Sequence, residues 1–239
     1  METIEKLLRW VEKPVDWMLW IALLAAVSAA LNAYGLPAGL RGAPLSLASW
    51  TSIGRNRQVV LLLIITALLL AGNFQVFVYF GPLLAKLAGA GPQTIALAFA
   101  GTGIIAVIGN VITTRVVGRI GPFRVSLVLF AGMLLGLLIW SAGTGWLAVM
   151  LLGAALIGVG TAAANSMQQA RLAAAAPELA GASIALNTSA IYVGQAIGSA
   201  AGGVLIVRDM APAVGYVAAA FMAAALLVLF LTRDESRKS

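Results

Sequence analysis

Charged residues in this chain enclose long stretches that contain no ionised side chain. The charge-free stretches are bounded by Arg57 and Lys86, Lys86 and Arg115, Arg124 and Arg171, Glu178 and Arg208, and Asp209 and Arg233. Each is long enough for one bilayer crossing of about 20 residues, and the third is long enough for two, divided at "SAGTGW". Soluble domains are about half apolar and about a quarter charged. Here 62% of the residues are hydrophobic, 10% are charged and the mean hydropathy is +1.01, so we expect a membrane protein.

The hydropathy pattern predicts an all-α polytopic fold with about seven transmembrane helices. The expected spans are 17–34, 58–80, 92–113, 123–140, 146–169, 183–207 and 213–232. With these bounds every Lys and Arg falls in a loop or a tail, apart from Arg124 at the edge of the span 123–140. Residues 1–16 place apolar and charged side chains on opposite helical faces, which predicts an amphipathic helix at the membrane interface that Pro14 ends.

The distribution of basic residues predicts the orientation in the membrane. The loops 35–57, 114–122 (with Arg124 at its edge) and 170–182 and the tail 233–239 together carry ten Lys and Arg residues, and the opposite side carries five. We therefore expect a protein of the cell (inner, cytoplasmic) membrane with a cytoplasmic C-terminus and an external N-terminus. The lipid bilayer is an expected partner, and nucleic acid is not.

The residue types that are missing narrow the chemistry. The sequence has no Cys and no His, which removes thiolate and imidazole metal ligands and the commonest general base. No retinal-type Schiff base is expected either, because all four Lys residues lie outside the spans. We expect no enzyme activity, no metal and no cofactor.

A weak internal repeat appears when the sequence is shifted by 93 residues. The shift pairs Asn73 with Ser166, Gln75 with Gln168, Gly101 with Gly194, Gly109 with Gly202 and Arg115 with Arg208. It lays spans two to four on spans five to seven, which would then have opposite topology, as in many transporters. Chance similarity among helices rich in Ala, Gly and Leu is the alternative.

Four stretches resemble the C-terminal half of a major facilitator superfamily transporter. They are "LPAGLRGAPLSLASW", "AGNFQVFVYFGPLL", "GNVITTRVVGRIGPFR" and "PELAGASIALNTSAIYVGQAIGSAAGG". The similarity is greatest to the drug–proton antiporter and arabinose-efflux-permease branch. It implies that 17–34 is the sixth helix, 35–57 the cytoplasmic linker, 58–232 a six-helix bundle with a 3+3 inverted repeat, and 233–239 a cytoplasmic tail. Helices one to five of that fold are absent from the sequence.

The resemblance also implies a motif in the cytoplasmic loop after the family's eighth helix. Its residues here are Gly109, Arg115, Arg119, Gly121 and Arg124. The family's acidic residue is replaced by Gly118, which puts a charge-paired latch in doubt. The alternative role for the three arginines is topology and contact with anionic lipid.

The span 183–207 carries two adjacent stripes. Thr188, Tyr192, Gln195 and Ser199 share one face, and the small residues Gly194, Gly198 and Gly202 form the next. Small residues at every fourth position let another helix approach closely, so we expect the glycines to pack against a neighbour. Because an unpaired polar group is costly in hydrocarbon, the polar face should meet a cavity or another helix.

The same argument applied to the other spans gives a set of candidate cavity-lining residues. They are Asn73, Gln75, Phe77, Tyr79, Asn165, Gln168, Asn187, Tyr192 and Gln195. Their alternative role is packing between helices, through hydrogen bonds for the amides and hydroxyls and through lipid or core contacts for the aromatic rings. The uncharged lining favours a small uncharged or amphiphilic solute.

No Asp, Glu, His or Lys lies within an expected span, and the one Arg, Arg124, lies at a span edge, so we expect no proton coupling in this membrane core. The leading hypothesis is half of an efflux transporter that works by alternating access, completed by a second half-transporter or by a homodimer. The alternative is a truncated or degenerate half-transporter that acts as a non-transporting assembly partner.

Overall fold

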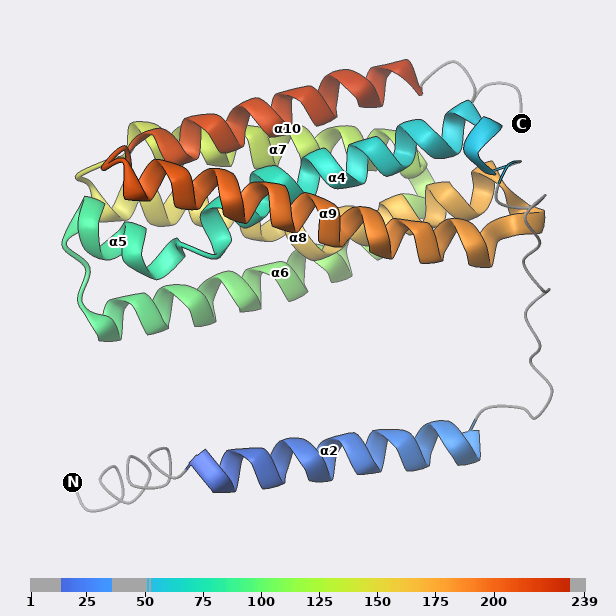
Figure 1. Cartoon of the computed structure of the whole chain (residues 1–239), viewed down its shortest axis with the longest axis horizontal. Helices are drawn as coiled ribbons and strands as arrows, with labels where there is room; N and C mark the ends of the chain where they lie inside the picture. Colours follow the sequence, from blue (N-terminus) through green and yellow to red (C-terminus); the bar gives the residue numbers. More distant parts are fainter. Residues whose placement is uncertain (1–13, 36–50, 52, 233–239) are drawn as a thin grey trace. The chain divides into compact units, whose positions relative to one another are not determined.

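The computed structural model describes residues 14–35, 51 and 53–232, and all regular structure in these residues is helical (Figure 1). The helices are α2 (Pro14–Gly35), α4 (Arg57–Phe77), α5 (Phe80–Ala88), α6 (Pro92–Ile120), α7 (Pro122–Ala142), α8 (Leu147–Ala175), the 3₁₀ turn η1 (Pro177–Leu179), α9 (Ala180–Val207) and α10 (Ala213–Leu231). The chain forms two units, residues 1–44 and 45–239. The predicted all-α membrane fold is confirmed.

The first unit contains one described helix, α2, which has 22 residues. At 1.5 Å per residue it is about 33 Å long. Pro14 is its first residue, where the missing N–H of proline does no harm. Of the expected interfacial segment, residues 1–13 lie outside the described residues, as do most of the expected linker and the tail 233–239.

The second unit contains six helices that are long and apolar enough to cross a membrane. They correspond to the expected spans two to seven, whereas the apolar part of α2, Met18–Asn32, is shorter, so a seventh crossing stays a prediction. With 29 residues each, α6 and α8 are about 43 Å long, which exceeds a hydrocarbon core of about 30 Å. Their ends therefore reach beyond the apolar layer.

The second expected span is interrupted. It was predicted to run to residue 80 and close at Gly81 and Pro82, but α4 ends at Phe77 and Pro82 lies inside the first turn of α5. Proline has no N–H, and its ring collides with the carbonyl four residues earlier, which here belongs to Val78. The chain consequently breaks before the proline and not after it.

The loop expected at 114–122 is also mostly helical. Arg115 and Arg119 lie in the last turns of α6, Arg124 lies in the first turn of α7, and Gly121 joins the two helices at φ +82°. A glycine adopts this conformation without strain. Gly109, expected to belong to the loop motif, lies within α6 and is buried against α8, where an added Cβ would collide with the carbonyl of Val159.

The contacts between helices follow the proposed repeat. Helix α4 packs on α9 and α10, and α8, its counterpart, packs on α6 and α7. The shift by 93 residues exchanges α4 with α8, α6 with α9, and α7 with α10, so the two sets of contacts are equivalent. In Figure 1, α6 lies along one edge of the bundle, next to α8.

Glycines mark the points where the paired helices cross most closely. A Cβ on Gly136 of α7 would lie 2.8 Å from the carbonyl oxygen of Gly153 of α8, and a Cβ on Gly72 of α4 would lie 2.8 Å from that of Ala218 of α10. Without a strong hydrophobic drive in lipid, such close approach gives the van der Waals contact that holds membrane helices together.

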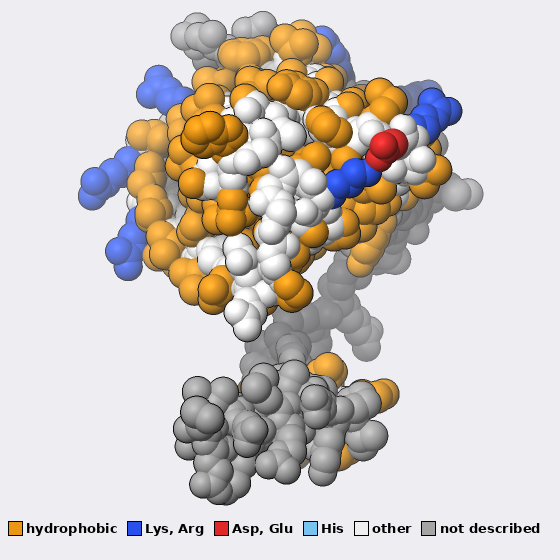
Figure 2. All heavy atoms as spheres, turned by 90° about the vertical axis from the view of Figure 1, so that its left-hand side faces the viewer, with side chains coloured by type: hydrophobic (Ala, Val, Ile, Leu, Met, Phe, Trp, Pro, Cys, Tyr) orange, Lys and Arg blue, Asp and Glu red, His pale blue; other side chains and the backbone are white. Residues whose placement is uncertain are grey.

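The core lies among α4, α7, α8 and α10. Its largest fully buried side chains include Leu62, Phe130, Trp140, Met150 and Met222. The sides of the helices are hydrophobic as well, with exposed Ile104, Val128, Leu152 and Leu227 among the large side chains. Figure 2 looks onto the end of the bundle where α5 lies, and even there hydrophobic side chains outnumber charged ones. This combination suits a bundle that is surrounded by lipid.

Candidate functional site

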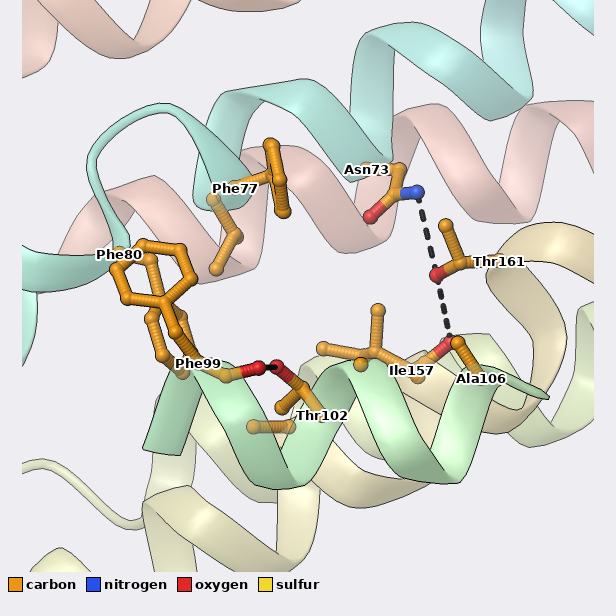
Figure 3. Close-up of a pocket in the computed structure, with 12 residues that line it drawn as sticks. Asn73, Phe77, Phe80, Phe99, Thr102, Ala106, Ile157 and Thr161 are labelled. Atoms are coloured by element: carbon orange, nitrogen blue, oxygen red, sulfur yellow. Dashed lines mark hydrogen bonds between the residues drawn. The ribbon is translucent and has the colours of Figure 1, made fainter. Parts of the chain in front are cut away.

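A pocket of about 280 Å³ lies between α4, α5, α6 and α8 (Figure 3). Helices α4 and α6 both pack on α8, which forms the floor between them. The small or aliphatic lining residues are Val76, Gly103, Ala106, Ala154, Ile157 and Gly158. No charged side chain lines the pocket.

Aromatic rings form one end of the pocket. Phe99 of α6 stands edge-on to Phe80 of α5, with ring centroids 4.8 Å apart, and to Phe77 of α4, at 6.1 Å. Phe80 also stacks on the buried Trp140, at 5.3 Å. Edge-to-face and offset stacking are the favoured arrangements of aromatic pairs, so this cluster holds a defined shape.

An amide and a hydroxyl form the other end. Asn73 Nδ2 donates to Thr161 Oγ1 over 3.4 Å, and Thr161 Oγ1 donates to the carbonyl of Ile157 over 2.9 Å. Because the single hydroxyl proton of Thr161 is used by Ile157, its oxygen must accept from Asn73. This fixes the amide of Asn73, and Figure 3 shows its oxygen turned away from Thr161. Asn73 Oδ1 has no hydrogen-bond partner among the described residues.

Of the nine expected cavity residues, Asn73 and Phe77 line this pocket. Two others hold helices together instead. Gln75 is fully buried, and its Nε2 donates to the carbonyl of Val214 on α10 over 3.2 Å. The hydroxyl of Tyr79 donates to the carbonyl of Ser199 on α9 over 2.9 Å. Gln75 on α4 and Tyr79 in the link between α4 and α5 thus contact α10 and α9 and do not line the pocket.

Three more expected residues belong to a buried polar network. Thr66 Oγ1 donates to Asn187 Oδ1 over 2.8 Å, and Asn187 Nδ2 donates to Asn165 Oδ1 over 3.4 Å. Gln168 Nε2 donates to Thr66 Oγ1 and to the carbonyl of Leu62, at 3.3 and 3.1 Å. Gln168 and Asn187 have no exposed surface, and Asn165 is half-buried. The network joins α4, α8 and α9, so Gln168 and Asn187 line no pocket of this chain.

The network continues to a cation that was expected in a loop. Arg171 lies within α8 and is 8% exposed. Its Nη1 donates to Gln168 Oε1 over 3.3 Å, its Nη2 donates to Thr232 Oγ1 over 2.6 Å, and its guanidinium lies 5.6 Å from the ring of Phe123. The expectation of a solvated loop arginine is wrong, because α8 runs on to Ala175 and α10 ends beside it.

The remaining two expected residues lie on the outside of α9. Tyr192 is 66% exposed and Gln195 is half-buried, and neither has a hydrogen-bond partner among the described residues. Gly194 and Gly198 face the other way, where an added Cβ would collide with the carbonyls of Ala67 and Ala71 of α4. Gly202 packs against the ring of Tyr79.

Sequence reasoning did not single out Phe99 and Thr102 as pocket residues. With Gly103 and Ala106 they follow the i, i+3, i+4, i+7 spacing of one helical face, which was the available signal. That face of α6 carries one polar residue among apolar ones, so it reads like a lipid-facing surface. Within the described residues no group of His, Cys, Asp or Glu could hold a metal ion.

At the end of the bundle where α5 begins to turn into α6, Lys86 forms an ion pair with Asp209 of the turn between α9 and α10. This contact holds the pKa of Asp209 below its usual value, chiefly through the hydrogen bond from Lys86. Both side chains are exposed, at 50% and 85%, so the pair lies in water and its contribution to stability is small.

Comparison with known proteins agrees with the fold. A family model described as Major Facilitator Superfamily matches residues 63–239. A Bacillus subtilis (strain 168) protein named "Uncharacterized MFS-type transporter YtbD" is 30% identical over 182 residues, which are 73% of this chain and 45% of that protein. This chain thus matches about half the length of that relative, and the efflux branch stays a prediction. With six apolar helices in one bundle, the chain is a multi-pass membrane protein that belongs to the major facilitator superfamily.

Proposed function

We propose that this chain is one half of a solute transporter, with α6, α8 and α9 lining a water-accessible path for a small neutral or amphiphilic molecule. The relative from Bacillus subtilis is named as a transporter, and this chain spans 45% of it. In transporters built from repeats, substrates bind between the halves, and rocking of one half against the other opens the site to each side in turn.

The observation that carries the proposal is the contrast between α9 and α7. The exposed side of α9 bears Tyr192, at 66% exposure, and Thr188 beside the aliphatic Val193, Ile197 and Val204. The exposed side of α7 bears Val128, Leu135 and Leu138. A phenol hydroxyl without an internal partner is costly against lipid tails, whereas aliphatic side chains are at home there. We infer that α7 faces lipid and α9 faces water or a second half.

Helix α8 supplies further polar groups between α6 and α9. Asn165 accepts a hydrogen bond from Asn187 of α9, and the hydroxyl proton of the next residue, Ser166, is shared between Asn110 Oδ1 of α6, at 3.5 Å, and the carbonyl of Ala162, at 3.3 Å. Asn165, Ser166 and Asn110 are all half-buried. A polar strip that joins three helices and remains partly exposed fits the wall of an aqueous path.

The proposal includes a partner. A wall made of one half needs an opposite wall, which a separate half-transporter or a second copy of this chain would provide. It also places the C-terminus in the cytoplasm, as the excess of Lys and Arg near that side favours. No Asp or Glu lies in α4 to α10, so a proton-coupling carboxylate would have to come from the other half.

The sequence contains no cysteine, which makes single-cysteine labelling a clean test. We would introduce Tyr192→Cys and Gln195→Cys separately and treat intact membranes with a water-soluble, membrane-impermeant thiol reagent. The matched control is Leu227→Cys on α10, because Leu227 is 69% exposed and Tyr192 is 66% exposed, yet Leu227 lies among apolar neighbours. Thiolates form only where water reaches the sulfur, so reactivity reports water access.

We expect both α9 cysteines to react and the Leu227→Cys protein to remain unlabelled. Labelling of the α9 positions that falls when a partner half or a second copy assembles would locate the opposite wall. If Tyr192→Cys and Gln195→Cys are as inert as Leu227→Cys, α9 faces lipid and the transport proposal fails.

A further inference from the structure

We infer that the pocket between α4, α5, α6 and α8 binds a small neutral molecule that carries one aromatic ring and one hydrogen-bond donor. The inference rests on the proposed transport function in so far as it names the class of solute. All the residues that line the pocket, however, belong to this one chain. Binding can therefore be measured without a partner half.

The size of the pocket sets the size of the ligand. A cavity of about 150 Å³ is known to hold benzene, and pockets for drug-sized ligands start at about 300 Å³. At about 280 Å³, this pocket has room for one substituted ring and little more. Phe77, Phe80 and Phe99 present ring faces and edges at one end, which favours an aromatic ring over an aliphatic chain of the same size.

The polar end of the pocket specifies a donor. The amide nitrogen of Asn73 is turned to Thr161, which leaves Asn73 Oδ1 as an acceptor without a partner among the described residues. Thr102, also in the lining, donates its hydroxyl proton to the carbonyl of Phe99 over 2.9 Å, so its oxygen too can only accept. A hydroxyl or N–H on the ligand can donate its proton to Asn73 Oδ1, and an ether or a methyl group cannot.

The lining also argues for a neutral ligand. None of the lining residues is charged, and Asn73 is 6% exposed. Moving an ion into such a place without a counter-charge is far more costly than moving a neutral hydroxyl. Access is available along α6, because Phe77 is 50% exposed, Phe99 is 40% exposed and Gly103 is exposed.

The experiment uses the purified full chain in detergent and three matched probes, 4-fluorophenol, 4-fluoroanisole and 4-fluorotoluene. They share the ring and differ in carrying a donor, an acceptor or neither. Binding is titrated by ¹⁹F NMR. Each dissociation constant is compared with that of a variant in the same detergent, so that partitioning of the probe into micelles cancels.

Asn73→Leu removes the acceptor at nearly constant volume. We expect it to weaken 4-fluorophenol binding about three- to tenfold, the range for one buried hydrogen bond, and to leave 4-fluorotoluene unchanged or slightly tighter. Gly103→Leu adds a bulky side chain to a lining position where a Cβ meets no atom within 4 Å, so the variant should fold and should weaken binding of all three probes. Gly101→Leu on the same helix is the control: its Cβ is equally free and it does not line the pocket, so binding should persist.

A second measurement covers the case in which Asn73→Leu does not fold. Gly103→Cys places a thiol in the lining, and 4-fluorophenol should slow its reaction with a thiol reagent more than 4-fluorotoluene does at equal occupancy of the micelle. Equal effects of the phenol and the toluene, or unchanged binding in Gly103→Leu, would overturn the inference. If the probes bind but the α9 cysteines do not react with the thiol reagent, the ligand pocket is supported and the transport proposal fails. If the α9 cysteines react but no probe binds, the transport proposal is supported and the ligand pocket fails.

Discussion

Arg171 Nη2 and Thr232 Oγ1 lie 2.6 Å apart and join the end of α8 to the residue that follows α10. The hydroxyl of Thr232 donates in turn to the carbonyl of Leu229, so its oxygen is held as an acceptor for the guanidinium. Arg171 is 8% exposed, and no carboxylate among the described residues pairs with it. A buried cation of this kind depends on each neutral acceptor that it has.

Replacing Thr232 by Val should therefore be destabilising although the shape is kept. A hydrogen bond to a charged group contributes about 1.5–3 kcal/mol, and its loss here leaves a buried donor unpaired. We expect the midpoint of thermal unfolding in detergent to fall in Thr232→Val. The same substitution should have little effect in an Arg171→Met background, where no donor remains. If Thr232→Val lowers the unfolding midpoint equally in both backgrounds, the Thr232 hydroxyl stabilises the protein only through its hydrogen bond to the carbonyl of Leu229.

The internal repeat offers a matched pair of glycines. Gly194 and Gly101 correspond under the shift by 93 residues, yet a Cβ at Gly194 collides with the backbone of Ala67, whereas one at Gly101 meets nothing within 4 Å. Gly194→Ala should reduce stability by about 1–3 kcal/mol through overpacking. Gly101→Ala should be neutral or stabilise by about 0.5–1 kcal/mol, because alanine loses less backbone entropy in a helix. Unfolding curves of the two variants, measured side by side, decide the matter.

Gln75 and Gln168, another repeat pair, should respond differently to leucine. Gln168 accepts from Arg171 and donates to Thr66, so Gln168→Leu strands two buried polar groups and should lower stability by about 2–4 kcal/mol. Gln75 already has an unpaired Oε1 among the described residues. Without Gln75, the carbonyl of Val214 can still accept a hydrogen bond within α10. Gln75→Leu should therefore change stability by less than about 1 kcal/mol. A large loss in Gln75→Leu, with probe binding also lost, would instead assign that side chain to the site.

The pH dependence of stability has one clear contributor outside the membrane helices. Lys86 holds the pKa of Asp209 below its usual value of 3.8. A carboxyl whose pKa is lowered by folding stabilises the fold above the unfolded-state pKa, and this is lost as pH falls through the folded-state pKa. Acid unfolding below about pH 4 should thus be less steep in Asp209→Asn than in the parent. Asparagine tolerates the φ of +60° at this position, so the turn should be preserved. Added salt should weaken the pair and shrink the difference.

Most of the helices were predictable, because membrane-spanning segments must be long and apolar and this shows in the local sequence. In α7 the expected span 123–140 and the helix Pro122–Ala142 nearly coincide, since Gly121 and Gly143 border a run whose one charged residue, Arg124, lies in its first turn. Arg171 was misplaced for the opposite reason. A positively charged residue was expected to lie in water, but Gln168, Thr232 and Phe123 stabilise the buried guanidinium of Arg171 near the end of α8. Gln168 belongs to α8 itself, but Phe123 comes from α7 and Thr232 from the end of α10, and local hydropathy contains no information about these two.

The candidate site was predictable only in part. Helical spacing places Gln75 and Asn73 on different faces of α4, with Tyr79 just beyond the end of that helix. It could not say which face met α9 and α10 and which met α6, because that depends on the order in which the helices pack. Asn73 therefore lines the pocket, while Gln75 and Tyr79 hold α4 to its neighbours.

The helix break before Pro82 divides one wall of the pocket between two helices, α4 and α5. Asn73 and Phe77 belong to α4, Phe80 belongs to α5, and only Val78 and Tyr79 connect the two helices. A molecule that touches both ends of the pocket would consequently contact α4 and α5 at once and restrain the angle between them. Ligand binding would then be coupled to the tilt of α5, and a change in that tilt would reach α7 through the stacked rings of Phe80 and Trp140.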